Sequence, residues 1–231
     1  MQEKMIIKGI LFDLDGTLAN TIPLCIAAYR QTFETFLGRP VSDQEIIANF
    51  GLSEEGIIRR VLPLHAGAGL QLYHDIYEKR HAECSEPFPG IKTVLDLLVQ
   101  RDIKMAVVTG KGTHTAHLTL KYLGIEHYFD TVEAGDAHAN VKAAAIGKIL
   151  RTWQMEPRYA AYVGDADTDM LDAVKAGVLP LAACWSETAT IHRLSSMTPF
   201  AIFTTVSEFI SWVNEHIPTP IISKRQYRME S

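Results

Sequence analysis

Short apolar runs alternate along this chain with segments of helical periodicity. The runs are continuous and rich in β-branched or aromatic residues, which is typical of strands buried on both faces of a parallel sheet. Between them, apolar residues recur every three or four positions, which predicts helices. The strands are expected over residues 6–12, 105–109, 129–132, 159–163, 178–183 and 200–203, and the helices over 91–100, 114–123, 141–153 and 167–176. This alternation predicts an α/β fold with right-handed crossovers.

One long stretch interrupts the alternation. Residues 21–87 contain no strand-like run, and their pattern predicts helices over 22–37, 43–49, 54–61 and 70–84. A structureless loop of that length does not suit a compact domain. We therefore expect a Rossmann-like core, with a parallel sheet and helices on both faces, formed by residues 1–20 and 88–231. A small all-helical domain, residues 21–87, is inserted into it. The polar tail 224–231 is expected to fray.

Composition and charge narrow the range of partners. The chain has 231 residues, 47% hydrophobic and 21% charged, and a net charge of −5. Mild acidity gives no broad attraction to nucleic acid or anionic membrane, so an anionic substrate must be held by local groups such as a metal ion or individual lysines. The N-terminal segment lacks the apolar run of a secretory signal, and the cysteines form no disulfide or zinc pattern. We expect a cytoplasmic protein, monomeric or homodimeric, with no nucleic-acid or membrane partner.

The first candidate for chemistry is the segment Asp13-Leu14-Asp15-Gly16-Thr17, directly after the first apolar run. Two carboxylates at the mouth of a buried strand repel one another unless a cation compensates. An oxygen-rich site of this kind suits Mg²⁺. A carboxylate can also attack phosphorus to form an aspartyl phosphate. Taken alone, the segment also fits a polar turn or a helix cap.

Further polar residues follow later strands, where open parallel sheets place their ligand sites. Thr109-Gly110-Lys111 offers a hydroxyl and free backbone N–H groups for phosphate, or forms an ordinary turn. Lys142 opens a predicted helix and alone resembles a surface lysine. The segment 164–169, with Asp165 and Asp169, either ligates a cation or caps the next helix.

The ordered combination of these segments resembles the haloacid dehalogenase superfamily over nearly the whole chain. The helical insertion resembles that superfamily's first-type cap domain. By pattern, the most similar members are phosphoglycolate-phosphatase-like hydrolases and β-phosphoglucomutase. The segment Phe50, Gly51 and Leu52 lies between two predicted cap helices, where a substrate-specificity loop is expected.

The resemblance implies a role for each motif residue. Asp13 is the nucleophile and a metal ligand, and Asp15 is the general acid/base whose main-chain oxygen also contacts the metal. Lys142 neutralises charge on the nucleophile and binds the phosphoryl group. The family usually has proline after this lysine, whereas Ala143 follows here. Lys148 is therefore the alternative lysine.

The remaining motif residues are assigned in the same way. Thr109 and the amide of Gly110 hold the phosphoryl group. Asp165 ligates Mg²⁺, and Asp169 supports the metal or the lysine from behind. The family's second motif commonly has asparagine where Gly110 stands.

The resemblance implies a Mg²⁺-dependent phosphatase that hydrolyses a small phosphorylated metabolite. Asp15 favours an alkoxide or phosphate leaving group over halide, because only the former needs a proton donor. A phosphotransferase or sugar-phosphate mutase of the same fold is the alternative, and an aspartate-phosphorylated signalling module is a third. Arg59 and Arg60 could meet an anionic substrate, and His114 and His117 could approach the site, but a surface position is the simpler interpretation of all four residues.

Overall fold

The computed structural model describes residues 6–219, in which six parallel strands form one sheet. The strand order is β3-β2-β1-β4-β5-β6. The strands are β1 (Gly9–Phe12), β2 (Lys104–Val108), β3 (Thr131–Glu133), β4 (Ala160–Gly164), β5 (Leu179–Ala183) and β6 (Ala201–Phe203). Each lies within or beside an apolar run of the sequence, with its ends shifted by a few residues. The expected α/β fold is confirmed.

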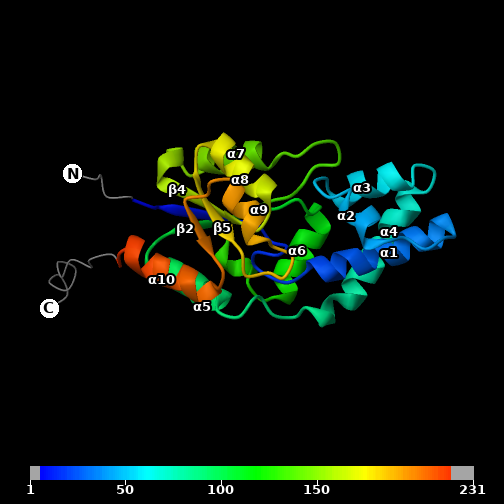
Figure 1. Cartoon of the computed structure of the whole chain (residues 1–231), viewed down its shortest axis with the longest axis horizontal. Coiled ribbons are helices and arrows are strands. Elements are labelled where there is room, and N and C mark those ends of the chain that lie inside the picture. The colour runs from blue at the N-terminus through cyan, green and yellow to red at the C-terminus, as the bar shows by residue number, and fades with distance from the viewer. Residues whose placement is uncertain (1–5, 220–231) are drawn as a thin grey trace, which may run out of the picture.

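Helices cover both faces of the sheet, as Figure 1 shows. Helices α5, α6 and α10 pack on one face, where Ile10 and Phe12 point, and α7 and α8 pack on the other, where Leu11 points; α9 contacts that second layer. The helices are α5 (Ile91–Gln100), α6 (Thr113–Tyr122), α7 (Lys142–Thr152), α8 (Asp167–Ala176), α9 (Ile191–Ser196) and α10 (Val206–His216). Because both faces are covered, β1 is buried along its whole length, which explains its unbroken apolar sequence.

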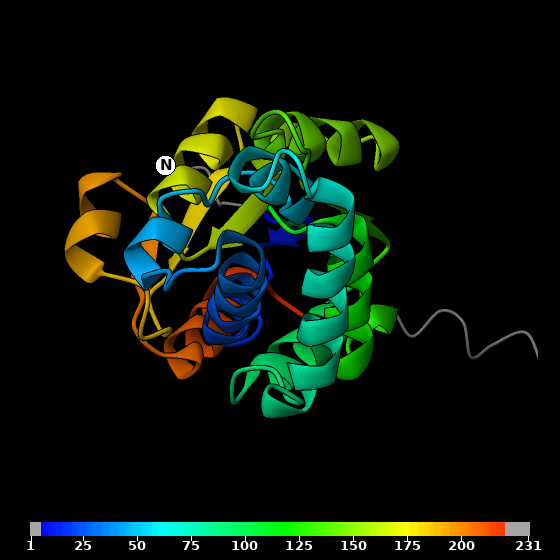
Figure 2. The same ribbon diagram turned by 90° about the vertical axis from the view of Figure 1, so that its right-hand side faces the viewer.

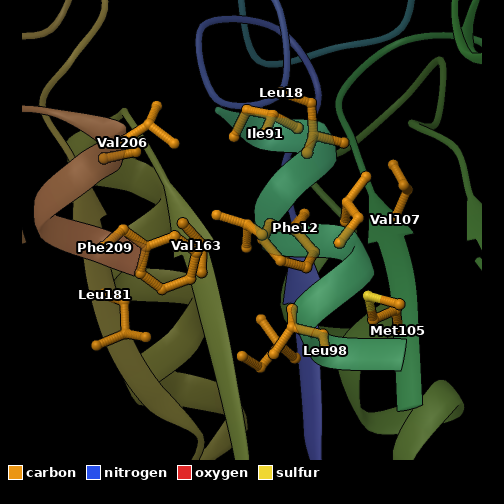
Figure 3. Packing of buried hydrophobic residues seen from close by; sticks show 14 of the residues in the cluster. Phe12, Leu18, Ile91, Leu98, Met105, Val107, Val163, Leu181, Val206 and Phe209 are labelled. Carbon is orange, nitrogen blue, oxygen red and sulfur yellow. The ribbon is translucent and has the colours of Figure 1, made fainter. Parts of the chain in front are cut away.

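Phe209 belongs to the largest hydrophobic core cluster of the described residues. Its ring is fully buried and packs against Phe203, with ring centroids 5.1 Å apart, and against Phe12 at 6.4 Å. Figure 3 shows Phe209 of α10 beside Val163 of β4. Through these contacts α10, the last helix of the described residues, packs against the central strands.

The sequence pattern did not lead us to expect α9 or α10. Helix α10 nevertheless carries a clear start signal, since Thr205 and Glu208 form a reciprocal capping box. Its buried positions Val206, Phe209 and Val213 also follow helical spacing. The helix was detectable from its sequence.

The inserted segment forms a helical group of its own. It comprises α1 (Ile22–Leu37), α2 (Asp43–Ile47), α3 (Glu54–Val61), α4 (Ala66–Arg80) and a 3₁₀ turn, η1 (His81–Glu83). These helices surround a separate hydrophobic cluster built on Tyr29, Phe33, Tyr73 and Tyr77. They lie beyond one end of the sheet in Figure 1, and Figure 2 views them from that side with α1 beside α4. Helix α4 begins at Ala66, earlier than the sequence pattern indicates.

The sequence analysis also considered the C-terminal tail and membrane-spanning segments. The tail 224–231 lies outside the described residues. Within residues 6–219, no helix combines the length and apolarity that a bilayer crossing requires.

Replacing Phe209 with alanine should lower the free energy of unfolding by about 3–5 kcal/mol, because it leaves a cavity between α10 and the sheet. Denaturant unfolding followed by circular dichroism would measure this change. Phe200→Ala is the matched control, because Phe200 is 53% exposed and its loss should cost under about 0.5 kcal/mol. Equal effects of the two substitutions would contradict this account of the core.

Candidate active site

The sequence-predicted site residues meet at one edge of the sheet. Phe12 pairs in register with Val107 of β2 and Val163 of β4, so the residues that follow these strands emerge side by side. A cavity of about 210 Å³ lies between this edge and the inserted helices. Its lining includes nearly all of the expected site residues: Asp13, Asp15, Phe50, Gly51, Leu52, Thr109, Gly110, Lys142 and Asp165.

Lys142 lies in the first turn of α7, and its side chain contacts Asp13, the predicted nucleophile. Its Nζ lies 3.1 Å from Asp13 Oδ1 and 2.6 Å from Asp169 Oδ1. Lys148 instead pairs with Glu133 at 2.7 Å, and its side chain is 63% exposed. The structure thus places Lys142, and not the alternative Lys148, among the carboxylates.

Asp13, Asp165 and Asp169 form a carboxylate cluster whose candidate ligand atoms lie within 4.8 Å of one another; Asp13 and Asp169 are buried and Asp165 is partly exposed. Burial, the largest effect, raises the pKa of Asp13 from 3.8 to about 7, although Lys142 opposes the shift. Burial and the neighbouring carboxylates hold the pKa of Asp165 well above its usual range. Such a cluster is electrostatically unfavourable without a further positive charge.

The cluster fits a hard divalent cation. Asp13 Oδ1 is buried, and the Lys142 ammonium 3.1 Å away makes an ion pair with it but no hydrogen bond, so this oxygen can still act as a ligand. Asp165 Oδ1 accepts a hydrogen bond from Thr17 at 3.2 Å. Both oxygens of Asp169 are occupied, one by Lys142 and the other by the backbone N–H of Ala166 at 3.0 Å. Asp13 and Asp165 are therefore better placed to bind a metal than Asp169, which is better placed to fix Lys142.

Asp15 turns away from this cluster. Its Oδ1 accepts a hydrogen bond from Thr21 and lies 3.2 Å from Lys111 Nζ. The next residue, Gly16, has φ +77°, and a Cβ there would lie 2.2 Å from Asp165 Oδ2. Glycine suits this position, because any side chain would be strained at this φ and would collide with the Asp165 carboxylate.

Thr109 and Gly110 form the floor of the cavity after β2. The Thr109 side chain is buried, and its Oγ1 accepts the backbone N–H of Lys111 at 3.2 Å. The loop after β3 lies directly behind, because a Cβ on Gly135 would lie 2.1 Å from the Gly110 oxygen. The peptide groups at this turn are thus held firmly at the strand end.

Lys111 is a site residue to which the sequence analysis assigned no role. It is 4% exposed, and its Nζ lies 3.2 Å from Cys25 Sγ and 4.3 Å from the centre of the Tyr77 ring. Burial alone would lower the pKa of Lys111, but Asp15 and other acidic groups outweigh it and hold the pKa above its usual range. A lysine directly after an apolar strand, within a candidate phosphate-binding turn, was the available signal.

Glu54 is the second site residue that the sequence analysis missed. It begins α3 yet is only 3% exposed, and its carboxylate accepts hydrogen bonds from Gly112 N–H and Thr115 Oγ1 at the start of α6. The backbone N–H of Ser53 also donates to Asp136 O at 3.0 Å. These bonds join the inserted helices to the core. In the sequence, Glu54 resembled an ordinary acidic residue of a first helical turn.

Of the other residues considered in the sequence analysis, some line the cavity and some lie away from it. Phe50 is 40% exposed at the cavity wall, with its ring 6.3 Å from that of Tyr29. Four polar residues lie outside the lining of this cavity, as far as the described residues show: Arg59, Arg60, His114 and His117. Arg59 approaches His138, His114 packs on His74, and His117 pairs with Glu126.

In EDTA, wild-type stability should fall relative to that of Asp13→Asn as the pH rises from about 4 to about 7. The raised pKa means that folded Asp13 keeps a proton that the unfolded chain releases in this range. Urea unfolding of both proteins at several pH values would measure the difference. Asp75→Asn, at an exposed position, is the control and should run parallel to wild type. Parallel curves for wild type and Asp13→Asn would contradict the burial argument.

Comparison with known proteins identifies the family. A model of the haloacid dehalogenase-like hydrolases matches residues 10–183. Pyrophosphatase PpaX from Halalkalibacterium halodurans is 31% identical over 176 residues, 75% of this chain and 82% of that protein. A haloacid dehalogenase-like hydrolase from Streptococcus pneumoniae shares 29% identity and a TM-score of 0.73, over 90% of this chain and 99% of that chain. A protein described as a predicted phosphoglycolate phosphatase from Haemophilus somnus shares the fold, with 20% identity and a TM-score of 0.74 over 90% of this chain and 98% of that chain. The chain therefore belongs to the haloacid dehalogenase-like hydrolase family, as its motifs predict.

Proposed function

We propose that this protein is a Mg²⁺-dependent phosphatase that passes the phosphoryl group of a small phosphorylated metabolite through a covalent bond to Asp13. The observation that carries the proposal is the convergence of Asp13, Lys142 and Asp165 at one strand edge, beneath a cavity that Asp15 also lines. The family match and the pyrophosphatase relatives support phosphatase chemistry.

In the first half-reaction, an Asp13 carboxylate oxygen attacks phosphorus, and the bond from phosphorus to the leaving oxygen breaks. Asp15 donates a proton to that oxygen, which leaves as an alcohol or acid. The ammonium group of Lys142 offsets negative charge on Asp13 and on the transferring group, and the Thr109 hydroxyl and Gly110 amide orient the phosphoryl oxygens. The products are aspartyl phosphate and the released leaving group.

In the second half-reaction, water attacks the phosphorus of the aspartyl phosphate. Asp15, now ionised, accepts the proton of that water, and the bond from Asp13 to phosphorus breaks. Inorganic phosphate is released, and both aspartates regain their starting states. Bound Mg²⁺, held by Asp13, Asp165 and the main-chain oxygen of Asp15, would supply positive charge that stabilises the phosphoryl group in both steps.

The inserted helices act in this proposal as a cap of residues 21–87 on a core of residues 1–20 and 88–231. They form one wall of the cavity, whose lining includes Phe50, Gly51 and Leu52, and in this proposal that segment closes on the substrate. A closed cap excludes bulk water while the phosphoryl group moves. We further propose a cytoplasmic enzyme, monomeric or homodimeric, that acts on small molecules.

The proposal is tested by phosphate release from a panel of phosphorylated metabolites. Wild-type protein should release phosphate with Mg²⁺ and not in EDTA, and Asp13→Asn should be inactive in both while its circular dichroism spectrum is unchanged. The reason is that the amide of asparagine is not a nucleophile for phosphorus. Full activity of Asp13→Asn would exclude the covalent route, and isomer formation without phosphate release would indicate a mutase.

Asp15→Asn should slow the transfer of the phosphoryl group from alkyl phosphates to Asp13 by about 10²–10⁴-fold, because it removes the proton donor. Acetyl phosphate should show a smaller loss in this first step, since acetate leaves without a proton. Release of the leaving group in a single turnover would measure the contrast without the later hydrolysis step, and Asp75→Asn provides the control. An equal loss for both substrates would argue against a leaving-group role for Asp15.

A further inference from the structure

The Asp15 side chain is anchored through one of its two oxygens. Its Oδ1 accepts a hydrogen bond from Thr21 Oγ1 and another from Lys111 Nζ at 3.2 Å, and Cys25 Sγ lies 3.9 Å from the same atom. Its Oδ2 accepts no hydrogen bond from another described residue, and the side chain is 22% exposed. Because Asp15 lines the cavity, Oδ2 is the oxygen that is available to a substrate there.

The ammonium group of Lys111 determines which oxygen of Asp15 can carry a proton. An ammonium group donates hydrogen bonds and accepts none. The oxygen that faces it, Oδ1, must therefore be an acceptor. When the Asp15 carboxyl is protonated, its proton lies on Oδ2, and Oδ1 still accepts the hydrogen bond from Lys111. The contact between Lys111 and Asp15 thus serves both the protonated and the ionised carboxyl.

The ammonium group is itself held in place. Lys111 is 4% exposed, and its Nζ lies 3.2 Å from Cys25 Sγ of α1 and 4.3 Å from the centre of the Tyr77 ring of α4. At the other end of the residue, the backbone N–H of Gly135 donates to Lys111 O at 2.6 Å. A buried lysine is costly unless it is paired, and Asp15 provides its one ion pair among the described residues. The side chain therefore has a defined position beside Asp15.

We propose that Lys111 is a positioning residue for the general acid/base: it holds Oδ1 of Asp15, so that Oδ2 performs both proton transfers. In the first half-reaction the bond from Oδ2 to hydrogen breaks as the leaving oxygen gains that proton. In the second, Oδ2 takes a proton from the attacking water. This inference rests on the proposed phosphatase function and adds a residue and an atom to it. Lys111 exchanges no proton and acts through Asp15.

Lys111→Met tests this role, because it removes the ammonium group and keeps an unbranched side chain. It should slow phosphoryl transfer from an alkyl phosphate to Asp13 about ten- to a hundredfold, the loss expected for one hydrogen bond to a charged group. Acetyl phosphate should be affected much less, since acetate leaves without a proton. Release of the leaving group in a single turnover, with Mg²⁺ and saturating enzyme, would measure both rates. Lys121→Met, at an exposed position of α6, is the matched control and should change neither.

A double variant distinguishes positioning from a separate effect. If Lys111 acts through Asp15, then adding Lys111→Met to Asp15→Asn should slow the reaction of the alkyl phosphate no further. A merely structural role would instead produce a second loss of similar size in the Asp15→Asn protein. That result would overturn the proposal, and so would equal losses for alkyl and acetyl phosphate in Lys111→Met.

A second variant covers the case in which Lys111→Met does not fold, as judged by circular dichroism. Thr21→Val removes the other donor to Oδ1 and should slow transfer from the alkyl phosphate about three- to tenfold, with little effect on acetyl phosphate. Equal rates for Thr21→Val and wild type would contradict the anchoring of Oδ1.

Failure of this inference is distinguishable from failure of the phosphatase function. If Asp13→Asn abolishes phosphate release and Lys111→Met matches wild type with both substrates, the phosphatase function stands and the role of Lys111 is wrong. If wild-type protein transfers phosphoryl groups from neither substrate nor from any other phosphorylated metabolite, the phosphatase function fails and the inference fails with it.

Discussion

Three carboxylates repel one another at this edge of the sheet, and the residues around them offset that repulsion. Asp13, Asp165 and Asp169 approach within 4.8 Å through their candidate ligand atoms. Lys142 opposes this repulsion directly, and backbone and hydroxyl donors satisfy oxygens of Asp165 and Asp169. The close approach also depends on Gly164, since a Cβ there would lie 2.5 Å from Cβ of Asp169. Under the proposed function, a divalent cation bound by Asp13 and Asp165 would offset this repulsion, and its binding would stabilise the folded state.

The core and the inserted helices contribute different kinds of residue to the cavity. Most of the charged groups at its floor follow strands or open helices of the core, where the register of parallel strands fixes their positions. The apolar wall and Glu54 belong to the insertion, which has its own hydrophobic cluster. Because the two contributions lie on separate packing units, substitutions in the wall can change substrate preference with little effect on the reacting groups.

The sequence predicted best those site residues that directly follow an apolar strand. Asp13, Thr109 and Asp165 each follow an apolar strand, so their convergence follows from the parallel sheet. Lys111 and Glu54 were missed because their importance arises from packing between segments far apart in sequence. Lys142 and Lys148 could not be separated by spacing alone. Only the path of α7 shows which of them turns towards the carboxylates.

The contact between Glu54 and the start of α6 also restricts which residues this chain can accept at the two positions. Glu54 and Gly112 are 58 positions apart, and a Cβ on Gly112 would lie 2.6 Å from Glu54 Oε2. A larger residue at 112 would push the carboxylate away from the backbone N–H that it accepts. A side chain at position 112 therefore requires a change at position 54 as well, so the packing of the insertion against the core couples these two positions of the chain.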